Sequence, residues 1–330
     1  MILVKYDKRN DLKPYFYFAL EEYILNNLLK KDEIFFFQWV IEGIVIGKNQ
    51  IIENEINLDF VRKNKIDVFR RPTGGGCVYN DSGTLIFSII VKKQDKNFNF
   101  KKYLSKIVEA FEKIGINLCL SARNDILLGD KKVSGNAFLQ NKNGIIIHGT
   151  ILYNCNVDTM VRCITPDQEK LISKGIQSVS SRIVNLQQHL KGMTKAELSA
   201  YLNNYLTNKQ YILNNQETNE IEELSKKYSS SEWILGEHPQ YNKKLKKHFD
   251  WGCLEILLSL SKGKIEKMFL KGDFFHKKDN SLEFLAQFEN IPYTQRSLRE
   301  ISKKIDISDY ILNSNNKDFF DLLETGILDL

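Results

Sequence analysis

Two arginines that lead into three consecutive glycines form the part of this sequence best suited to chemistry. The run is Arg70-Arg71-Pro72-Thr73-Gly74-Gly75-Gly76-Cys77-Val78-Tyr79. Ordering each glycine costs about 0.5–1 kcal/mol more than ordering alanine, so three in a row need a physical reason. Close approach of main-chain N–H groups to a phosphate or carboxylate, beside two guanidinium groups, supplies that reason. The alternative is a mobile glycine turn with two solvated arginines.

An apolar run of strand length, residues 84–91, follows the glycines after the turn-forming residues Asp81-Ser82-Gly83. The glycine loop is therefore expected between two extended segments. No Gly-Lys-Ser/Thr sequence follows the glycines and no helix begins there, so the phosphate loop of nucleoside triphosphatases is excluded. The dinucleotide-binding fingerprint is excluded as well.

A second informative block, residues 123–152, predicts three short strands joined by a tight turn at Gly129-Asp130 and a polar loop at 141–144. Lys132 and Ser134 are two residues apart and are expected on one face of a strand, where they could clamp a carboxylate or phosphate. An exposed pair, Lys131 and Lys132, in a β-turn is the alternative, and Lys131 fits it. His148, taken alone, is typical of a hydrogen-bonded structural histidine.

The flanking segments predict how these residues are positioned. Apolar residues recur at helical spacing over 14–30 and over 100–115, which indicates two amphipathic helices. Residues 34–40 and 43–47 are expected as two strands of a hairpin or near-hairpin. Because strands and helices alternate irregularly, we expect an α+β fold with mixed and antiparallel sheets flanked by helices.

The C-terminal third predicts a second, smaller α/β domain. Residues 188–230 are polar and helical, and the serine-rich stretch 226–231 is the best candidate for a linker. Residues 251–260 and 264–270 form a β-hairpin signature around Ser261-Lys262-Gly263, with helices expected at 279–290 and 296–304. The chain is therefore divided into a catalytic domain, residues 1–230, and an accessory domain, residues 231–330.

Composition limits the class of protein. The 330 residues carry a net charge of +6 with no basic tail, which favours an acidic partner or anionic substrate over nucleic acid. No apolar stretch is long enough for a membrane span, and the N-terminus becomes charged too early for a signal peptide, so a cytoplasmic protein is expected. The five cysteines include no CxxC pair, and neither a disulfide framework nor a zinc cluster is indicated.

Four motifs in order resemble the lipoate-protein ligase A family of the class II biotin and lipoyl ligase superfamily, over nearly the whole chain. They are residues 70–83, Arg123-Asn124-Asp125, Lys132-Val133-Ser134-Gly135-Asn136-Ala137 and His148-Gly149-Thr150. Residues 174–186 look like the family's adenylate-binding region. Trp251-Gly252 and Lys271-Gly272-Asp273-Phe274-Phe275 look like the accessory domain of the full-length ligase.

The resemblance implies a two-step reaction. Lipoate reacts with ATP to give lipoyl-adenylate and pyrophosphate. The lipoyl group then passes to a lysine of an acceptor, either the lipoyl domain of a 2-oxoacid dehydrogenase E2 subunit or the glycine-cleavage H protein. Fixed cations and loop N–H groups suit such a site, because two anions must be brought together against their repulsion. A monomer with no nucleic-acid or membrane partner is expected.

The resemblance also assigns residues. Lys132 is implied as the catalytic residue that bridges the lipoyl carbonyl and the α-phosphate. The implied ATP and adenylate contacts are Arg70, Arg71, Gly74, Gly75, Gly76, Cys77, Val78, Tyr79, Lys132, Ser134, Gly135, Ala137 and Ser181. The implied lipoate contacts are Arg70, Gly75, Lys132, His148 and Gly149. Mg²⁺ is expected on the phosphates, with Asn124 and Asp125 as candidate ligands.

Three positions depart from the family pattern. Asn80 stands where the family usually has histidine, Ser180 replaces a frequent arginine, and a tryptophan that commonly lines the lipoate pocket corresponds to Gln38 or Trp39. An octanoyl or lipoyl transferase of the same fold remains an alternative, because it would use a cysteine thiolate such as that of Cys77, Cys155 or Cys163. A non-catalytic lipoate-binding protein is the other alternative.

Overall fold

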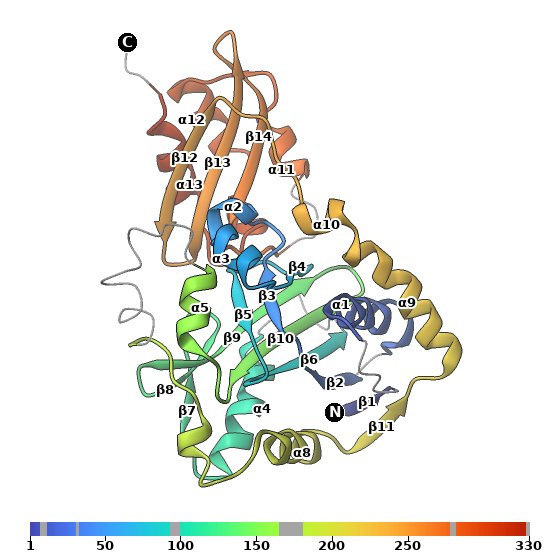
Figure 1. Cartoon of the computed structure of the whole chain (residues 1–330). Helices are drawn as coiled ribbons and strands as arrows, with labels where there is room; N and C mark the ends of the chain where they lie inside the picture. Colours follow the sequence, from blue (N-terminus) through green and yellow to red (C-terminus); the bar gives the residue numbers. More distant parts are fainter. Residues whose placement is uncertain (7–11, 31–32, 93–99, 165–180, 278–281, 328–330) are drawn as a thin grey trace.

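An eight-stranded mixed sheet forms the centre of the larger domain (Figure 1). The computed structural model describes residues 1–6, 12–30, 33–92, 100–164, 181–277 and 282–327. In spatial order the strands of the sheet are β11 (Lys209–Ile212), β1 (Ile2–Lys5), β2 (Ile34–Trp39), β6 (Thr84–Lys92), β10 (Gly144–Leu152), β9 (Lys131–Gln140), β8 (Asp125–Leu128) and β7 (Leu118–Leu120). Strand β1 runs parallel to both of its neighbours, and all the other pairs are antiparallel.

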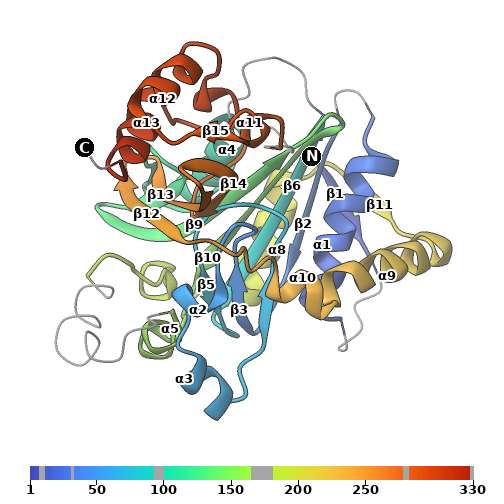
Figure 2. The same ribbon diagram turned by 90° about the horizontal axis from the view of Figure 1, so that it is seen from above.

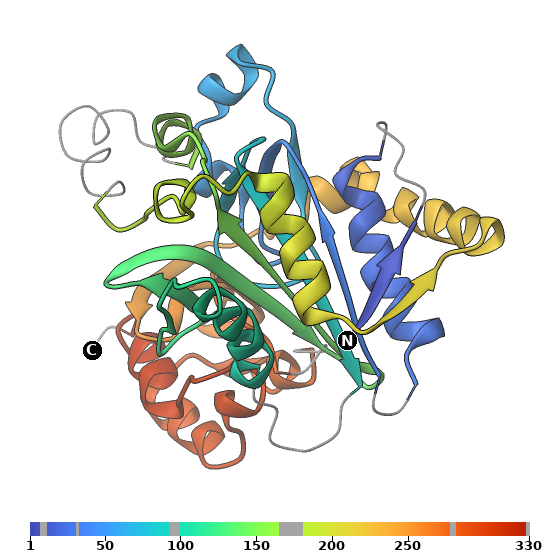
Figure 3. The same cartoon turned by 90° about the horizontal axis from the view of Figure 1, so that it is seen from below.

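Helices cover both faces of this sheet, as Figure 3 shows from below. One face carries α4 (Lys101–Glu112) and α8 (Lys195–Leu206), and the other carries α1 (Pro14–Tyr23), the π-helical turn η1 (Ile24–Leu28) and α9 (Asn215–Ser229). The central strands are apolar on both sides, because Phe36 and Ile89 enter the first core while Phe35 and Ile90 enter the second. The expected mixed sheet and the helices predicted at 14–30 and 100–115 are confirmed.

A smaller three-stranded sheet carries the glycine loop. Its order is β4 (Val68–Arg70), β3 (Gly43–Ile46) and β5 (Val78–Asn80). The predicted hairpin of 34–40 with 43–47 is wrong, because β2 pairs with β1 and β6 while β3 pairs with β4 and β5. The connection contains Ile41, which is buried in the core, and such an anchored apolar residue does not suit a solvent-facing hairpin turn.

Short helical segments complete the larger domain. They are α2 (Ile52–Glu55), α3 (Leu58–Lys63), α5 (Val157–Ile164), η3 (Gln187–His189) and α10 (Ser231–Leu235). The three strands predicted within 123–152 are confirmed as β8, β9 and β10. Among the described residues, no helix is both long and apolar enough to cross a membrane.

The accessory domain has its own antiparallel sheet and its own core. Its elements are β12 (Lys243–Phe249), β13 (Gly252–Ser261), β14 (Lys264–Gly272), α11 (Leu282–Ala286), β15 (Ile291–Pro292), α12 (Gln295–Ser302), η4 (Ile307–Asp309) and α13 (Asn316–Glu324). The predicted hairpin is confirmed, with Lys262 and Gly263 both at positive φ, as a two-residue turn requires. Of the helix predicted at 279–290 the structure shows α11, and residues 279–281 lie outside the described residues.

The predicted serine-rich linker is mostly helical. Residues 226–229 end α9, and Ser230 caps α10, which continues from α9 toward the three-stranded sheet (Figure 2). Trp233 Nε1 donates to Arg70 O at 2.7 Å, so α10 is tied to the larger domain. The division into residues 1–230 and 231–330 stays a prediction, and these contacts place residues 231–235 against the larger part.

Arg70 holds this junction together from within. Its buried guanidinium donates to the carbonyl oxygens of Gly47, Lys48, Gln50, Ile234 and Leu235 at 2.7–3.1 Å. One side chain therefore satisfies carbonyls from the loop after β3 and from the end of α10. Burial lowers the pKa of Arg70 to about 10, which still leaves it charged at neutral pH.

Arg70→Met should lower the free energy of unfolding by about 3 kcal/mol or more, because several buried carbonyls lose their donor at once. Urea denaturation followed by circular dichroism measures this loss. The exposed Arg62 at the end of α3 is the matched control, and Arg62→Met should change stability by less than about 0.5 kcal/mol. Equal effects of the two substitutions would contradict the structural role of Arg70.

Glu55, the last residue of α2, lies at the junction of the two domains. Burial, together with the nearby carboxylates of Asp273 and Glu255, raises the pKa of Glu55 from 4.5 to about 7, against the opposing effect of Lys244 and Lys246. The folded protein therefore holds a proton that the unfolded chain releases. The resulting stabilisation is complete below about pH 4.5 and is lost as the pH rises through about 7.

Glu55→Gln should remove this pH dependence, because the amide stays neutral throughout. We expect the wild type to lose on the order of 2 kcal/mol relative to Glu55→Gln between pH 5 and pH 8. Thermal unfolding of both proteins across that range measures the difference. Parallel curves for the two proteins would show that Glu55 does not titrate in this interval.

Candidate functional site

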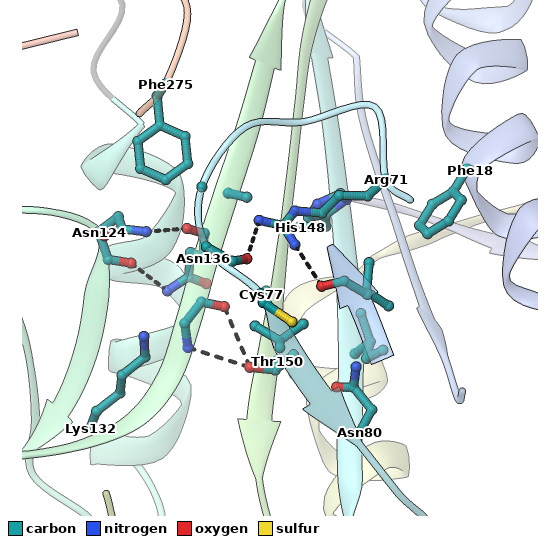
Figure 4. Close-up of a pocket in the computed structure, with 18 of the residues that line it drawn as sticks. Phe18, Arg71, Cys77, Asn80, Asn124, Lys132, Asn136, His148, Thr150 and Phe275 are labelled. Atoms are coloured by element: carbon teal, nitrogen blue, oxygen red, sulfur yellow. Dashed lines mark hydrogen bonds between the residues drawn. The ribbon is translucent and has the colours of Figure 1, made fainter. Parts of the chain in front are cut away.

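A cavity of about 110 Å³ lies where the glycine loop faces strands β9 and β10 (Figure 4). Many of the residues selected from the sequence line it, namely Arg71, Gly75, Gly76, Cys77, Val78, Asn124, Lys132, Gly135, Ala137, His148 and Gly149. The structure thus brings together segments that are up to about 80 positions apart in the chain. The cavity is smaller than the usual 300–1,000 Å³ of a ligand site.

Arg71 shapes the glycine loop from inside. Its guanidinium donates to the carbonyl oxygens of Val45, Gly74 and Gly76 and to Thr73 Oγ1, at 2.7–3.2 Å. The side chain is buried, and burial lowers its pKa to about 10, so it is cationic at neutral pH. The charge of Arg71 is therefore directed first at the loop carbonyls, which fixes the path of the loop past the cavity.

Glycine is required at the centre of the loop for two reasons. Gly75 has φ of +87°, where a side chain is strained, and a Cβ there would lie 2.9 Å from the Phe275 ring. Its N–H donates to Phe274 O at 3.2 Å. In this structure the group that approaches the glycines is the accessory domain's own chain, and the predicted approach of an anion stays a prediction.

Phe275 closes one side of the cavity. Its ring stacks on Phe138 with centroids 5.1 Å apart, and Phe138 in turn stacks on Phe100. Arg123 Nη2 lies 3.2 Å from Asp273 Oδ1, which adds an ion pair between the domains. The small volume of the cavity follows, because the Phe274-Phe275 segment occupies the space over the loop.

A buried hydrogen-bond chain connects the loop to helix α1, which covers the same face of the sheet. Arg71 Nε donates to Thr73 Oγ1, which lies 2.8 Å from His148 Nε2, and His148 Nδ1 lies 3.0 Å from Glu21 Oε1. Ser88 Oγ donates to the same carboxylate oxygen and accepts from Trp39 Nε1. The Thr73 hydroxyl can donate one bond and accept two, so the direction of its bond to His148 Nε2 depends on the tautomer of the ring.

Both ring nitrogens of His148 are therefore engaged by protein groups. The prediction of a hydrogen-bonded structural histidine is confirmed, and the ring also lines the cavity. Glu21 could not be selected from the sequence, because an acidic residue in an amphipathic helix is ordinarily solvated. Its side chain is fully buried beneath the sheet.

Lys132 brings an amine to the cavity from strand β9. Its Nζ lies 2.8 Å from Asp125 Oδ1 on β8, and the side chain is 38% exposed. The ladder between β8 and β9 contains a register shift at which Val133 is the extra residue. The prediction that Lys132 and Ser134 share a face is wrong for this reason, and Gly135 lies beside the amine instead.

Several residues implied for the site lie elsewhere in the structure. Arg70, Gly74, Tyr79, Asp125, Ser134 and Ser181 do not line the cavity. The guanidinium of Arg70 is directed at carbonyls of the domain junction, and Ser134 is buried with its hydroxyl donating to Asn136. Ser180 and residues 174–179 lie outside the described residues.

The opposite half of the cavity is apolar. It is lined by Phe18, Trp39, Val45, Val78 and Ile86, and Asn80 lies among them. Of the two candidates for the family's pocket tryptophan, Trp39 lines the cavity and Gln38 does not. The remaining lining residues are Asn136, Thr150 and Phe275, which lie within motifs quoted from the sequence but were not assigned as contacts there.

The two proposed magnesium ligands have protein partners. The Asn124 amide donates to Asn136 O, and Asp125 is paired with Lys132. The described residues contain no group of three or more His, Cys, Asp or Glu side chains arranged to hold a metal. These donors fit a Mg²⁺ ion held mainly by phosphate oxygens and water, and the roles of Asn124 and Asp125 as ligands stay predictions.

Comparison with known proteins agrees with this geometry. Residues 13–207 match the lipoyl protein ligase A/B catalytic domain, and residues 238–323 match the bacterial lipoate protein ligase C-terminus. Lipoate-protein ligase LplJ of Bacillus subtilis is 33% identical over 331 residues, which cover 96% of this chain and 98% of that protein.

Two solved structures share the fold. LipL1 of P. falciparum, in complex with lipoate, has a TM-score of 0.78 at 24% identity and covers 100% of this chain and 99% of its own. A lipoate-protein ligase A bound with ATP has a TM-score of 0.60 at 23% identity and covers 72% of this chain and 97% of its own. From its catalytic and C-terminal regions together, the chain belongs to the lipoate-protein ligase family.

Proposed function

We propose that this protein is an ATP-dependent lipoate-protein ligase, which activates lipoate as lipoyl-adenylate and transfers the lipoyl group to a lysine of an acceptor protein. The observation that carries the proposal is one cavity with two unlike halves. One half presents the Lys132 amine and the arginine-fixed glycine loop, and the other is lined by aromatic and aliphatic side chains. A hydrocarbon acid and a polyphosphate need these two surfaces side by side.

In the first step, a carboxylate oxygen of lipoate attacks the α-phosphorus of ATP and pyrophosphate leaves. The two reactants repel each other, so a fixed cation between them lowers the barrier by offsetting charge on the phosphoryl and carboxylate oxygens. Lys132 fits this role because its ammonium group is at the cavity and Asp125 holds it in place. Mg²⁺ carried with ATP would neutralise further phosphate charge.

In the second step, the neutral amine of an acceptor lysine attacks the lipoyl carbonyl carbon, an amide bond forms, AMP leaves and the amine gives up a proton. Lys132 would stabilise the negative charge that develops on the carbonyl oxygen. The acceptor that we propose is the lipoyl domain of a 2-oxoacid dehydrogenase E2 subunit or the glycine-cleavage H protein. We propose that the ligase acts as a monomer in the cytoplasm.

The cysteine-dependent transferase is the second candidate, and only Cys77 favours it. Cys77 lines the cavity, whereas Cys155 and Cys163 are buried away from it. Burial raises the pKa of the Cys77 thiol well above its ordinary value, so the reactive thiolate is suppressed at neutral pH. The geometry therefore supports ATP-dependent activation better than a thioester route.

Lys132→Ala should reduce lipoyl-adenylate formation by at least about 100-fold, because the fixed positive charge at the reacting oxygens is lost. Stability should change by less than about 1 kcal/mol, since the ion pair with Asp125 is partly exposed. Mass spectrometry of an acceptor lipoyl domain incubated with ATP, Mg²⁺ and lipoate measures the product. The neighbouring Lys131 is exposed, so Lys131→Ala is the control and should retain activity; full activity of Lys132→Ala would refute the assignment.

Cys77→Ser should leave ATP-dependent lipoylation within about threefold of wild type, because no bond is made to the sulfur on the adenylate route. The same incubation, with pyrophosphate release followed in parallel, checks this. Loss of transfer together with an acyl adduct on Cys77 in the wild type would favour the transferase. Tight lipoate binding by the wild type without any adenylate would favour the non-catalytic carrier.

A further inference from the structure

Asn80 is a buried amide with no protein partner among the described residues. The residue is 1% exposed, and neither Oδ1 nor Nδ2 has a hydrogen-bond partner there. Leaving both atoms of a buried amide unpaired is costly, and groups of this kind in folded proteins call for an explanation. The amide belongs to a wall of the cavity, so a bound ligand is the natural source of a partner.

The position of Asn80 within the cavity indicates which part of a substrate it meets. On β5, Asn80 follows Val78 by two residues and shares its face, and Val78 pairs with Val45 of β3. These valines belong to the apolar half of the cavity. In Figure 4, Asn80 and Lys132 lie on opposite sides of the cavity, with Thr150 between them.

The proposed reaction fixes the orientation of the acid. Its carboxylate lies at Lys132, so its hydrocarbon tail extends away from the amine and toward Phe18, Trp39 and Ile86. Lipoate ends in a five-membered ring that contains two sulfur atoms. Octanoate, the straight-chain acid with the same eight carbons, ends in methylene and methyl groups and offers no hydrogen-bond acceptor there.

We propose that Asn80 selects lipoate over octanoate by donating from Nδ2 to a sulfur atom of the dithiolane ring, an inference that rests on the proposed ligase function. A disulfide sulfur is a weak acceptor, but any acceptor offsets part of the cost of removing water from the amide. A bound octanoyl tail also removes that water, but it offers the amide no hydrogen-bond acceptor. Oδ1 stays unpaired with either acid, so its cost cancels in the comparison.

The experiment compares kcat/KM for lipoate and octanoate with saturating ATP and an acceptor lipoyl domain, read by mass spectrometry. Wild type should prefer lipoate by about fivefold or more, the factor that one net hydrogen bond of about 1 kcal/mol provides. Asn80→Leu, of similar volume, should bring the two acids within about twofold, mainly by improving the use of octanoate. KM for ATP should not change.

Asn49→Leu is the matched control. Asn49 is also a buried asparagine with an unpaired Nδ2 among the described residues, but it lines a different cleft, together with Lys48 and His276. The ratio between the two acids should therefore stay at the wild-type value in Asn49→Leu. A similar loss of selectivity in both variants would overturn the proposal.

Thermal unfolding of the ligand-free protein separates selection from a structural role. Asn80→Leu should keep or raise Tm, since an unpaired buried amide is replaced by an apolar side chain. If Asn80→Leu does not fold, Asn80→Ala removes the amide without a branched side chain and serves for the same kinetic comparison.

Two further outcomes are decisive. An unchanged ratio of kcat/KM for lipoate and octanoate in Asn80→Leu, or a change confined to KM for ATP, would show that the amide does not contact the acyl tail. Failure of the wild type to lipoylate the acceptor with either acid would instead contradict the proposed function itself, so the two failures are distinct.

Discussion

The site depends on one buried cation that is bonded to the protein itself, the guanidinium of Arg71. This guanidinium donates to the carbonyl oxygens of Gly74 and Gly76 in the loop, to Val45 O on β3 and to Thr73 Oγ1. A three-glycine loop has little intrinsic preference for any path, so a rigid donor fork at its centre determines the path it takes. The lysine, the histidine and the apolar wall then line a cavity whose edge is fixed.

The hydrogen bond from Arg71 to Thr73 also connects the glycine loop to helix α1 and to the apolar half of the cavity. Through Thr73 and His148 the loop reaches Glu21 on helix α1, and through Ser88 the carboxylate reaches Trp39 in the apolar half of the cavity. The buried Glu21 carboxylate accepts from two side chains, Ser88 and His148, and removal of either donor leaves part of it without a partner. One buried chain of hydrogen bonds therefore fixes the polar side of the cavity relative to the apolar side.

Much of this could be predicted from the sequence, because the informative signals were local. The glycine loop, the apolar strand after it and the hairpin around Gly263 each follow from residue type and spacing. Features that depend on contacts with residues far along the chain could not be predicted, because residue type and spacing carry no information about those contacts. The pairing of β2 and β3, the extra residue Val133 and the burial of Glu21 are all fixed by tertiary contacts.

The role of Arg70 is a further feature that could not be predicted from the sequence. Two adjacent arginines beside glycines predict an anion site, and the residue types alone do not separate an arginine that faces a ligand from one that binds carbonyls. Here both guanidinium groups bind carbonyls, and the cavity is lined by Lys132 together with Arg71.

In the proposed reaction, a phosphate that accepts from the Gly75 amide would compete with Phe274 O of the accessory domain, which accepts from that amide in this structure. Any phosphate that needs this amide must first displace an intramolecular ligand present at a fixed, high effective concentration. The apparent affinity for ATP would then be the intrinsic affinity multiplied by the fraction of molecules in which that contact is open. By thermodynamic reciprocity, a partner that draws the accessory domain away would tighten nucleotide binding by the same factor by which the nucleotide favours that partner.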